Sequence, residues 1–202
     1  TNLFLLFNLA LGLCMCEIQV HPVTRRLARN FDGLFPEEDL LKEPHVVVTL
    51  AMKTKHRQSA MSNEMLKERQ LCYGQLVEKM QAFKEHFDAA ERWCDFIDPS
   101  TGAPFHADSS TTLLECDERY RSLGFEILEL GCCKALCNKS FGQCLVMTSA
   151  FVQGEDVQSA LPLLEIALAE DAKDVGGPTV KVAEKVAGEA ASTKVSAGYA
   201  TG

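Results

Sequence analysis

The thiol groups of nine cysteines are the clearest source of chemistry in this 202-residue chain. Their number is odd, most of them lie within apolar patterns, and no secretory signal is visible, so we expect free thiols rather than a disulfide framework. Three of them have apolar neighbours, and packing alone accounts for them: Cys72, Cys94 and Cys116. Cys132 and Cys133 differ because these two thiols are adjacent in the sequence.

The residues around Cys132 and Cys133 determine how reactive this pair is. Gly131, which precedes the pair, permits a ligand or partner to approach the backbone closely. If the segment is extended, one thiol lies in the core and the other points outward, because neighbouring side chains alternate between faces. Lys134 favours a thiolate by its charge, whereas two glutamates just upstream oppose one. The residues alone support one reactive or metal-coordinating thiol and two buried cysteines equally.

Other kinds of catalytic or metal site find little support in the sequence. A zinc site of four cysteines is an alternative, although the spacing does not match a zinc ribbon. Its ligands would be Cys132, Cys133, Cys137 and Cys144. No dinucleotide-binding glycine motif, phosphate-binding loop, HExxH or GxSxG motif occurs, and the five histidines show no spacing typical of a catalytic triad. The sequence therefore predicts no conventional acid–base catalysis.

The composition limits the class of protein. With 28 acidic residues against 20 Lys and Arg, the chain carries a net charge of −8, which disfavours a nucleic-acid partner. The apolar fraction of 47% is ordinary for a globular protein. No apolar run approaches the roughly 18 residues that span a bilayer, so we expect no membrane partner. These properties predict a soluble, acidic protein with a single domain.

Residues 16–171 carry the periodic patterns of a folded domain. A stripe of Met, Leu and Phe at helical spacing predicts a long helix over residues 63–91. A β-branched run predicts a buried strand over residues 46–52. Weaker patterns predict helices at 22–31, 117–121 and 157–168, a turn at 98–102, and strands at 111–114 and 143–152. Helices and strands mixed without a regular βαβ repeat indicate an α+β layer fold.

The two ends of the chain differ from this body. Residues 1–15 are mostly apolar, and we interpret them as a fragment end or a buried strand, because a secretory signal needs a preceding basic residue and a cleavage site. Residues 172–202 contain no Leu, Ile, Phe, Met or Trp. Such a segment buries too little apolar surface to offset the entropy of ordering it, so we expect a disordered tail.

Several motifs, in the same order along the chain, resemble one known family. They are residues 93–102 (WCDFIDPSTG), 117–125 (DERYRSLGF), 130–134 (LGCCK), 16–19 (CEIQ) and 31–36 (FDGLFP). Together they resemble the methylmalonic aciduria and homocystinuria type D family, whose members serve in cobalamin (vitamin B12) trafficking. The resemblance spans residues 16–152, and a match of several motifs in register is specific.

This resemblance implies a nitroreductase-like α+β fold that has lost flavin chemistry. It implies an adaptor resembling a metallochaperone, not an enzyme, which binds no cofactor alone and shares cobalamin with a partner. In this family the protein engages the type C cobalamin-processing protein and routes cobalamin toward methionine synthase and methylmalonyl-CoA mutase. The resemblance therefore implies a location in the cytoplasm and the mitochondrion, although no targeting segment is visible in the sequence.

The resemblance also implies which residues form the site. In this family a cysteine thiolate of the LGCCK motif coordinates the cobalt of the cobalamin that the partner holds. By motif position this ligand is Cys132, with Cys133 as the second choice and Gly131 and Lys134 as supporting residues. A thiolate suits this role because it is a soft, strongly donating ligand.

Two alternatives to a trafficking adaptor stay open. One is a flavin-dependent or thiol reductase on the same fold, although the sequence lacks a CxxC pair and an obvious basic cluster for phosphate. The other is a purely structural interaction module. In that module the charged residues of the DERYR motif form local salt bridges rather than partner contacts. These residues are Asp117, Glu118, Arg119 and Arg121.

Overall fold

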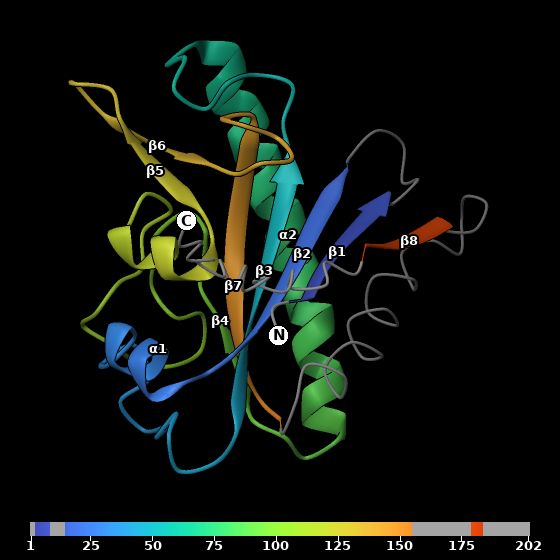
Figure 1. Cartoon of the computed structure of the whole chain (residues 1–202), viewed down its shortest axis with the longest axis vertical. Helices are drawn as coiled ribbons and strands as arrows, with labels where there is room; N and C mark the ends of the chain where they lie inside the picture. Colours follow the sequence, from blue (N-terminus) through green and yellow to red (C-terminus); the bar gives the residue numbers. More distant parts are fainter. Residues whose placement is uncertain (1–2, 9–14, 155–178, 184–202) are drawn as a thin grey trace, which may run out of the picture.

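The centre of the molecule is a six-stranded antiparallel sheet with the strand order β4-β7-β3-β2-β1-β8 (Figure 1). The structure is a computed structural model that describes residues 3–8, 15–154 and 179–183. The strands of this sheet are β1 Leu3–Asn8, β2 Cys16–Pro22, β3 His45–Lys53, β4 Cys94–Phe96, β7 Leu145–Gln153 and β8 Thr179–Ala183. The other described elements are α1 Arg25–Asn30, α2 Asn63–Ala89, the 3-10 helix η1 Glu118–Leu123, and the paired strands β5 Glu126–Glu129 and β6 Lys134–Cys137.

Strands β3 and β7 are neighbours inside the sheet, and both of their faces are mostly apolar. Eight of the nine residues in each strand are buried. The two strands pair along their whole length, from His45 opposite Gln153 to Lys53 opposite Leu145. A strand that is covered on both faces needs no polar side, so its sequence is largely apolar. The strands predicted at 46–52 and 143–152 are therefore confirmed.

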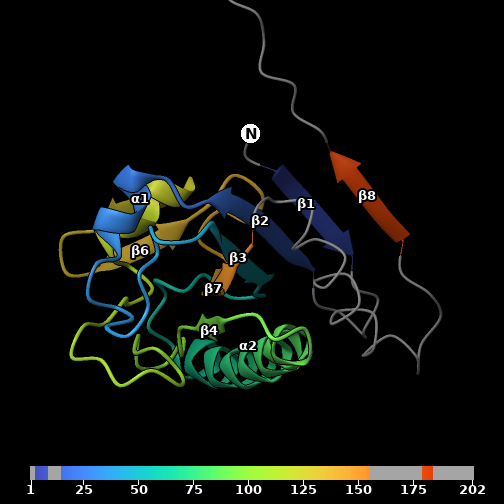
Figure 2. The same ribbon diagram turned by 90° about the horizontal axis from the view of Figure 1, so that it is seen from below.

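Helix α2 covers one face of the sheet (Figure 2). Ser62 caps the helix, since its Oγ accepts a hydrogen bond from the backbone N–H of Met65 at 3.2 Å. The stripe of residues that packs on the sheet consists of Cys72, Leu76, Met80, Phe83 and Phe87. The helix predicted at 63–91 is confirmed and ends at Ala89. No helix in the described residues is long and apolar enough to cross a membrane.

The opposite face of the sheet is covered by α1, η1 and the β5–β6 hairpin (Figure 2). Tyr120 of η1 is the largest fully buried side chain, and its hydroxyl lies 3.3 Å from Oγ of Ser149 in β7. Phe31, just after α1, packs edge-on against Phe151 of β7, with 5.0 Å between the ring centroids. The sheet thus has an apolar core on each face, and the predicted mixture of α and β structure is confirmed.

Strand β2 alternates apolar and polar residues, and all but the last of them are buried. The apolar residues belong to the core under α2: Cys16, Ile18 and Val20. The polar residues between them face the other side of the sheet: Glu17, Gln19 and His21. The helix predicted from residue 22 begins at Arg25 instead, because Pro22 ends β2 and Thr24 caps α1 through its Oγ.

Two further expectations need correction. Residues 111–114 form a loop rather than the predicted strand, because the N–H of Leu113 donates to the carbonyl of Gly102 in another loop. In the expected tail, β8 pairs with β1, so the expectation of disorder does not hold for residues 179–183. The pairing also agrees with the strand interpretation of the N-terminal segment. The rest of 172–202 and the helix predicted at 157–168 lie outside the described residues.

Candidate functional site: a cysteine-bearing hairpin

The two adjacent cysteines lie at the tip of the β5–β6 hairpin, which projects away from the sheet (Figure 1). The strands pair from Glu126 opposite Cys137 to Glu129 opposite Lys134. This register leaves residues 130–133 as a four-residue connection. The hairpin base is anchored in the core through Ile127 of β5, whereas the tip extends beyond it.

The backbone of the tip depends on Gly131. The N–H of Leu130 donates to the carbonyl of Cys133 at 2.9 Å, and the N–H of Cys132 donates to the carbonyl of Leu130 at 3.1 Å. The second bond closes a three-residue turn around Gly131, whose φ is +82°. A Cβ atom at Gly131 would meet no atom within 4 Å, so the backbone angle, rather than a lack of space, requires glycine.

This turn presents both thiols near the surface. Cys132 is exposed and Cys133 is half-buried, with their sulfur atoms 3.9 Å apart. The condition under which one of the two thiols would lie in the core is not met, because the segment is a turn rather than an extended strand. The neighbouring Cys132 thiol raises the pKa of Cys133 by its hydrogen bond. The Cys133 thiol therefore resists ionisation beside its neighbour.

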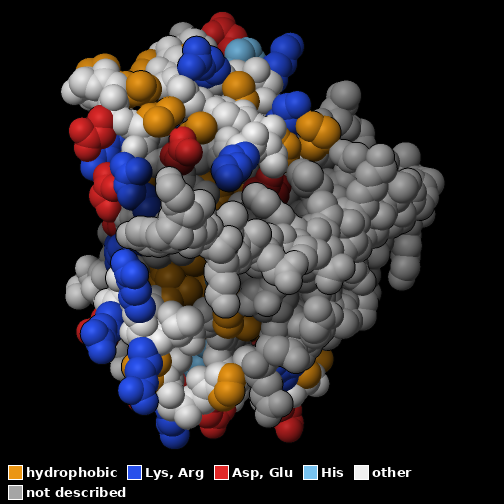
Figure 3. All heavy atoms as spheres, viewed as in Figure 1, with side chains coloured by type: hydrophobic (Ala, Val, Ile, Leu, Met, Phe, Trp, Pro, Cys, Tyr) orange, Lys and Arg blue, Asp and Glu red, His pale blue; other side chains and the backbone are white. Residues whose placement is uncertain are grey.

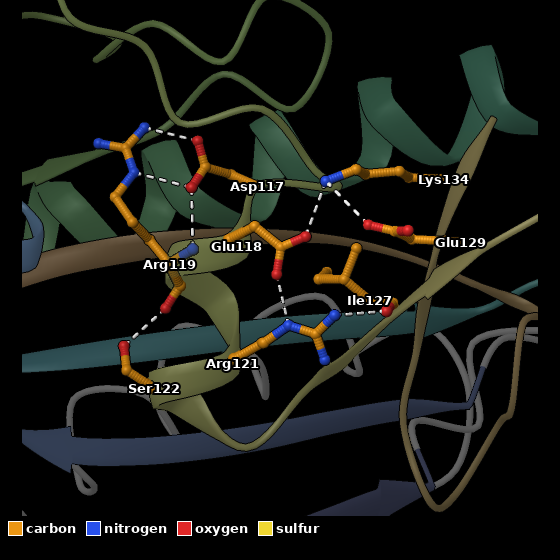
Figure 4. Close-up of polar contacts among 8 residues, drawn as sticks. All are labelled: Asp117, Glu118, Arg119, Arg121, Ser122, Ile127, Glu129 and Lys134. Atoms are coloured by element: carbon orange, nitrogen blue, oxygen red, sulfur yellow. Dashed lines mark hydrogen bonds and ion pairs between the residues drawn. The ribbon is translucent and has the colours of Figure 1, made fainter.

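Lys134 forms ion pairs with carboxylates rather than contacts with the two thiols. Its Nζ lies 2.7 Å from Oε1 of Glu118 and 3.8 Å from Oε1 of Glu129 (Figure 4). The hydrogen bond that Lys134 donates to Glu118 raises the pKa of the Lys134 ammonium. We expected Lys134 to favour a thiolate at Cys132 or Cys133. Among the described residues its ion pairs are instead with the two glutamates, which offset its charge.

The DERYR motif forms a network of local ion pairs on η1. Asp117 caps η1 by accepting from the backbone N–H of Arg119 at 2.9 Å, and it also accepts from the Arg119 guanidinium at 2.8 Å (Figure 4). Glu118 pairs with the guanidinium of Arg121. These contacts match the local salt bridges of the structural interpretation. The Arg119 guanidinium holds the pKa of Asp117 below its usual range, and Arg121 followed by Lys134 does the same for Glu118.

This network also fixes the hairpin relative to η1. Arg121 Nη2 donates to the carbonyl of Ile127 in β5 at 2.7 Å, while Glu118 holds Lys134 in β6 (Figure 4). Each strand of the hairpin is therefore tied to the same helix. Exposed pairs of this kind contribute only about 0–1 kcal/mol each to stability. Their main effect is to orient the hairpin, and with it Cys132.

A buried carboxylate beside the hairpin was not foreseen from the sequence. The Glu115 side chain is 9% exposed, and its Oε2 lies 3.3 Å from Nη2 of Arg69 and 3.1 Å from the hydroxyl of Tyr73 in α2. Burial raises the pKa of Glu115, and burial together with the Glu115 charge raises the pKa of Cys116. The sequence feature that points to this buried carboxylate is a glutamate inside the otherwise apolar run 113–116. The contact ties α2 to the loop before η1.

The structure does not bring the cysteines together as a metal site. Among the described residues, no group of three or more His, Cys, Asp and Glu side chains could hold a metal ion. Cys137 is half-buried and donates weakly to the carbonyl of Asn138 at 3.7 Å. The alternative of a zinc site is therefore wrong for the described residues. The hairpin therefore presents one exposed thiol, that of Cys132, at a position fixed relative to η1.

Comparison with known proteins identifies the family. The sequence model of the methylmalonic aciduria and homocystinuria type D protein family matches residues 8–162. The chain belongs to this family. Three similar proteins are each named cobalamin trafficking protein CblD. Those of rat and human are 36% and 35% identical over 137 residues, which is 67% of this chain and 45% of theirs. The chicken protein is 33% identical over 142 residues, or 69% of this chain and 46% of its own.

The family match covers both halves of the site, since the hairpin and η1 lie within residues 8–162. This match confirms the family resemblance from which Cys132 and Cys133 were chosen as candidate cobalt ligands. The chain spans slightly less than half the length of the curated relatives it matches.

Proposed function

We propose that this chain serves in intracellular cobalamin trafficking as an adaptor without catalytic activity of its own. Membership of the type D family supports this proposal, and so do the names of the similar proteins from rat, human and chicken. The observation that carries it is the exposed Cys132 thiol at the tip of a hairpin whose base is held by η1.

In this proposal the Cys132 thiolate ligates the cobalt of a cobalamin that the type C cobalamin-processing protein holds. Cobalamin is then a shared cargo, and the chain binds no cofactor alone. A thiolate donates strongly to a metal, and only one exposed thiol is needed for this step. The exposure of Cys132 and the partial burial of Cys133 favour Cys132 as the ligand.

The further parts of the proposal follow from the family resemblance. The cargo passes to methionine synthase and methylmalonyl-CoA mutase, and the chain acts in the cytoplasm and the mitochondrion. The fold is nitroreductase-like, an assignment supported by one long helix packed on an antiparallel sheet that carries a core on each face. A flavin-dependent reductase remains the alternative function.

The test is an ultraviolet–visible spectrum of the chain mixed with the cobalamin-loaded type C partner. We expect a new thiolate–cobalt absorption band that Cys132→Ala abolishes and Cys133→Ala retains. Cys137→Ala is the matched control, since it removes a half-buried thiol from the same hairpin without touching the tip.

Two outcomes would overturn parts of this proposal. A band that survives in Cys132→Ala but is lost in Cys133→Ala would move the ligand to the neighbouring thiol. No band with any variant, although the partner is bound, would remove cobalt ligation and leave a scaffold. A flavin spectrum in the purified protein would instead favour the reductase.

A further inference from the structure

A second site lies on the same face of the sheet, between the end of β2, helix α1 and η1. The cleft has a volume of about 570 Å³, within the range of small-molecule sites. Its lining is mostly polar and includes His21, Thr24, Arg26, Asn30, Glu118 and Arg121. Figure 3 shows Lys and Arg side chains in a row down the left side of this face.

His21 lies in the wall of this cleft with an unused hydrogen-bonding atom. The alternation of β2 directs its side chain to the face that α1 and η1 cover, as for Gln19. His21 is only 3% exposed, and its Nε2 has no hydrogen-bond partner among the described residues. Buried polar atoms in folded proteins are almost always paired, so a ligand that reaches Nε2 would gain a hydrogen bond that the free chain lacks.

The charges around the cleft indicate that this ligand is an anion. Helix α1 contributes three arginines and no acidic residue, although the whole chain has a net charge of −8. Arg26 is exposed and lines the cleft from one side, and Arg121 lines it from the other. The carboxylate of Glu118 also lines it and pairs with Arg121 and Lys134, so the excess positive charge in the described lining comes from Arg26.

We propose that this cleft binds the phosphate group of a small molecule, with Arg26 and Arg121 donating to the phosphate oxygens and His21 Nε2–H donating from the wall. The forked guanidinium group matches phosphate oxygens in geometry as well as in charge. The cleft assembles groups about a hundred residues apart in the chain, which explains why the sequence shows no basic cluster for phosphate.

The protonation state of His21 agrees with this arrangement. Burial lowers the pKa of His21 to about 4, so the ring is neutral near pH 7 and carries one N–H donor. A neutral donor in the wall and two cationic arginines at the sides fit a group with several acceptor oxygens.

The proposal does not depend on cobalamin or on the hairpin thiols, so its test needs neither. The phosphate could be free, a monoester or a diester. We would titrate the full chain with inorganic phosphate, glycerol 3-phosphate and dimethyl phosphate by calorimetry. In parallel, nitrogen NMR would follow the His21 ring. We expect saturable binding of at least one ligand together with a shift of the His21 Nε2 resonance.

The variant that tests the site is Arg26→Gln, with Arg25→Gln as its matched control. Both residues are exposed on α1 and carry the same charge, but only Arg26 lines the cleft. We expect Arg26→Gln to weaken binding by about tenfold or more, since a charge-assisted hydrogen bond is lost. We expect Arg25→Gln to change it by less than about twofold.

Two results would overturn the proposal. Equal weakening by both variants would show a diffuse attraction to the basic helix rather than a site. The absence of saturable heat and of any His21 shift with all three ligands at millimolar concentration would exclude a phosphate site. Neither result bears on the cobalt ligand, which is tested by Cys132→Ala.

Discussion

Cys94 and Cys132 show the same side chain in two opposite settings. Cys94 lies in β4 at one edge of the central sheet, is 3% exposed and packs in the core under α2. Burial raises the pKa of its thiol far above the usual value. Cys132 is exposed at the tip of a two-stranded hairpin. The chain therefore contains inert and accessible thiols, and position in the fold, not residue type, separates them.

The same contrast holds for the two regions as a whole. The central sheet and α2 are held by apolar packing on both faces, with residues such as Leu50 and Leu76 almost completely buried. The hairpin tip is held by two backbone hydrogen bonds, and the two strands are tied to η1 by the Lys134–Glu118 ion pair and by the hydrogen bond from Arg121 to the carbonyl of Ile127. Such a region opens at lower cost than a core. This division leaves a reactive group accessible without exposing the core.

The largest effect we expect from this contrast concerns thiol alkylation. Iodoacetamide near neutral pH should modify Cys132 at least about a hundred times faster than Cys94, because Cys94 is buried and its thiolate is strongly disfavoured. Peptide mass spectrometry over time measures the two rates. In guanidinium chloride the rates should converge. Comparable rates in the native protein would contradict the assignment of Cys94 to the core.

Local sequence patterns were sufficient for the elements of the core. Helix α2 carries one helical stripe along its whole length, whereas β3 and β7 are largely apolar runs, and each element was predicted to within two residues. Strand β2 alternates, but Pro22 and the apolar spacing beyond it suggested a helix that begins too early. For residues 111–114 the apolar composition suggested a strand, whereas the partner of Leu113 is another loop.

The candidate site was predicted only in part. Motif resemblance singled out Cys132, but its exposure depends on the register that places Glu129 opposite Lys134. The pairing of Lys134 with Glu118 joins residues 16 positions apart, and no local pattern encodes it. The same limit applies to the cleft, where Arg26 and Arg121 meet only through the tertiary fold.

Smaller changes in stability, of opposite sign, are expected when a glycine is replaced by alanine in the hairpin and in α2. Gly131→Ala should destabilise the hairpin by about 1–2 kcal/mol, because φ is +82° there. Gly74 lies within α2, where a Cβ would meet no atom within 4 Å. Gly74→Ala should therefore stabilise the protein by about 0.5–1 kcal/mol.

Urea unfolding measures the global change for both glycine variants, and native-state hydrogen exchange separates the hairpin amides from those of α2. Faster exchange in Gly131→Ala should be confined to the hairpin. Faster exchange of α2 amides in that variant would show that the hairpin and the core open as one unit.

The smallest effect concerns the ion pair that caps η1. The Arg119 guanidinium lowers the pKa of Asp117 below its usual 3.8, so the pair stabilises the fold at pH values above 3.8. This contribution is lost as the pH falls through the lower, folded-state pKa.

Asp117→Asn keeps the capping side chain and removes only the charge, so it should cost less than about 1 kcal/mol near neutral pH and nothing in strong acid. The measurement is the urea midpoint of both proteins as a function of pH. In an Arg119→Gln background the same substitution should cost clearly less, because the partner charge is already gone. An undiminished effect in that background would mean that the Asp117 charge acts on the backbone N–H of Arg119 or on Lys134 rather than on the Arg119 guanidinium.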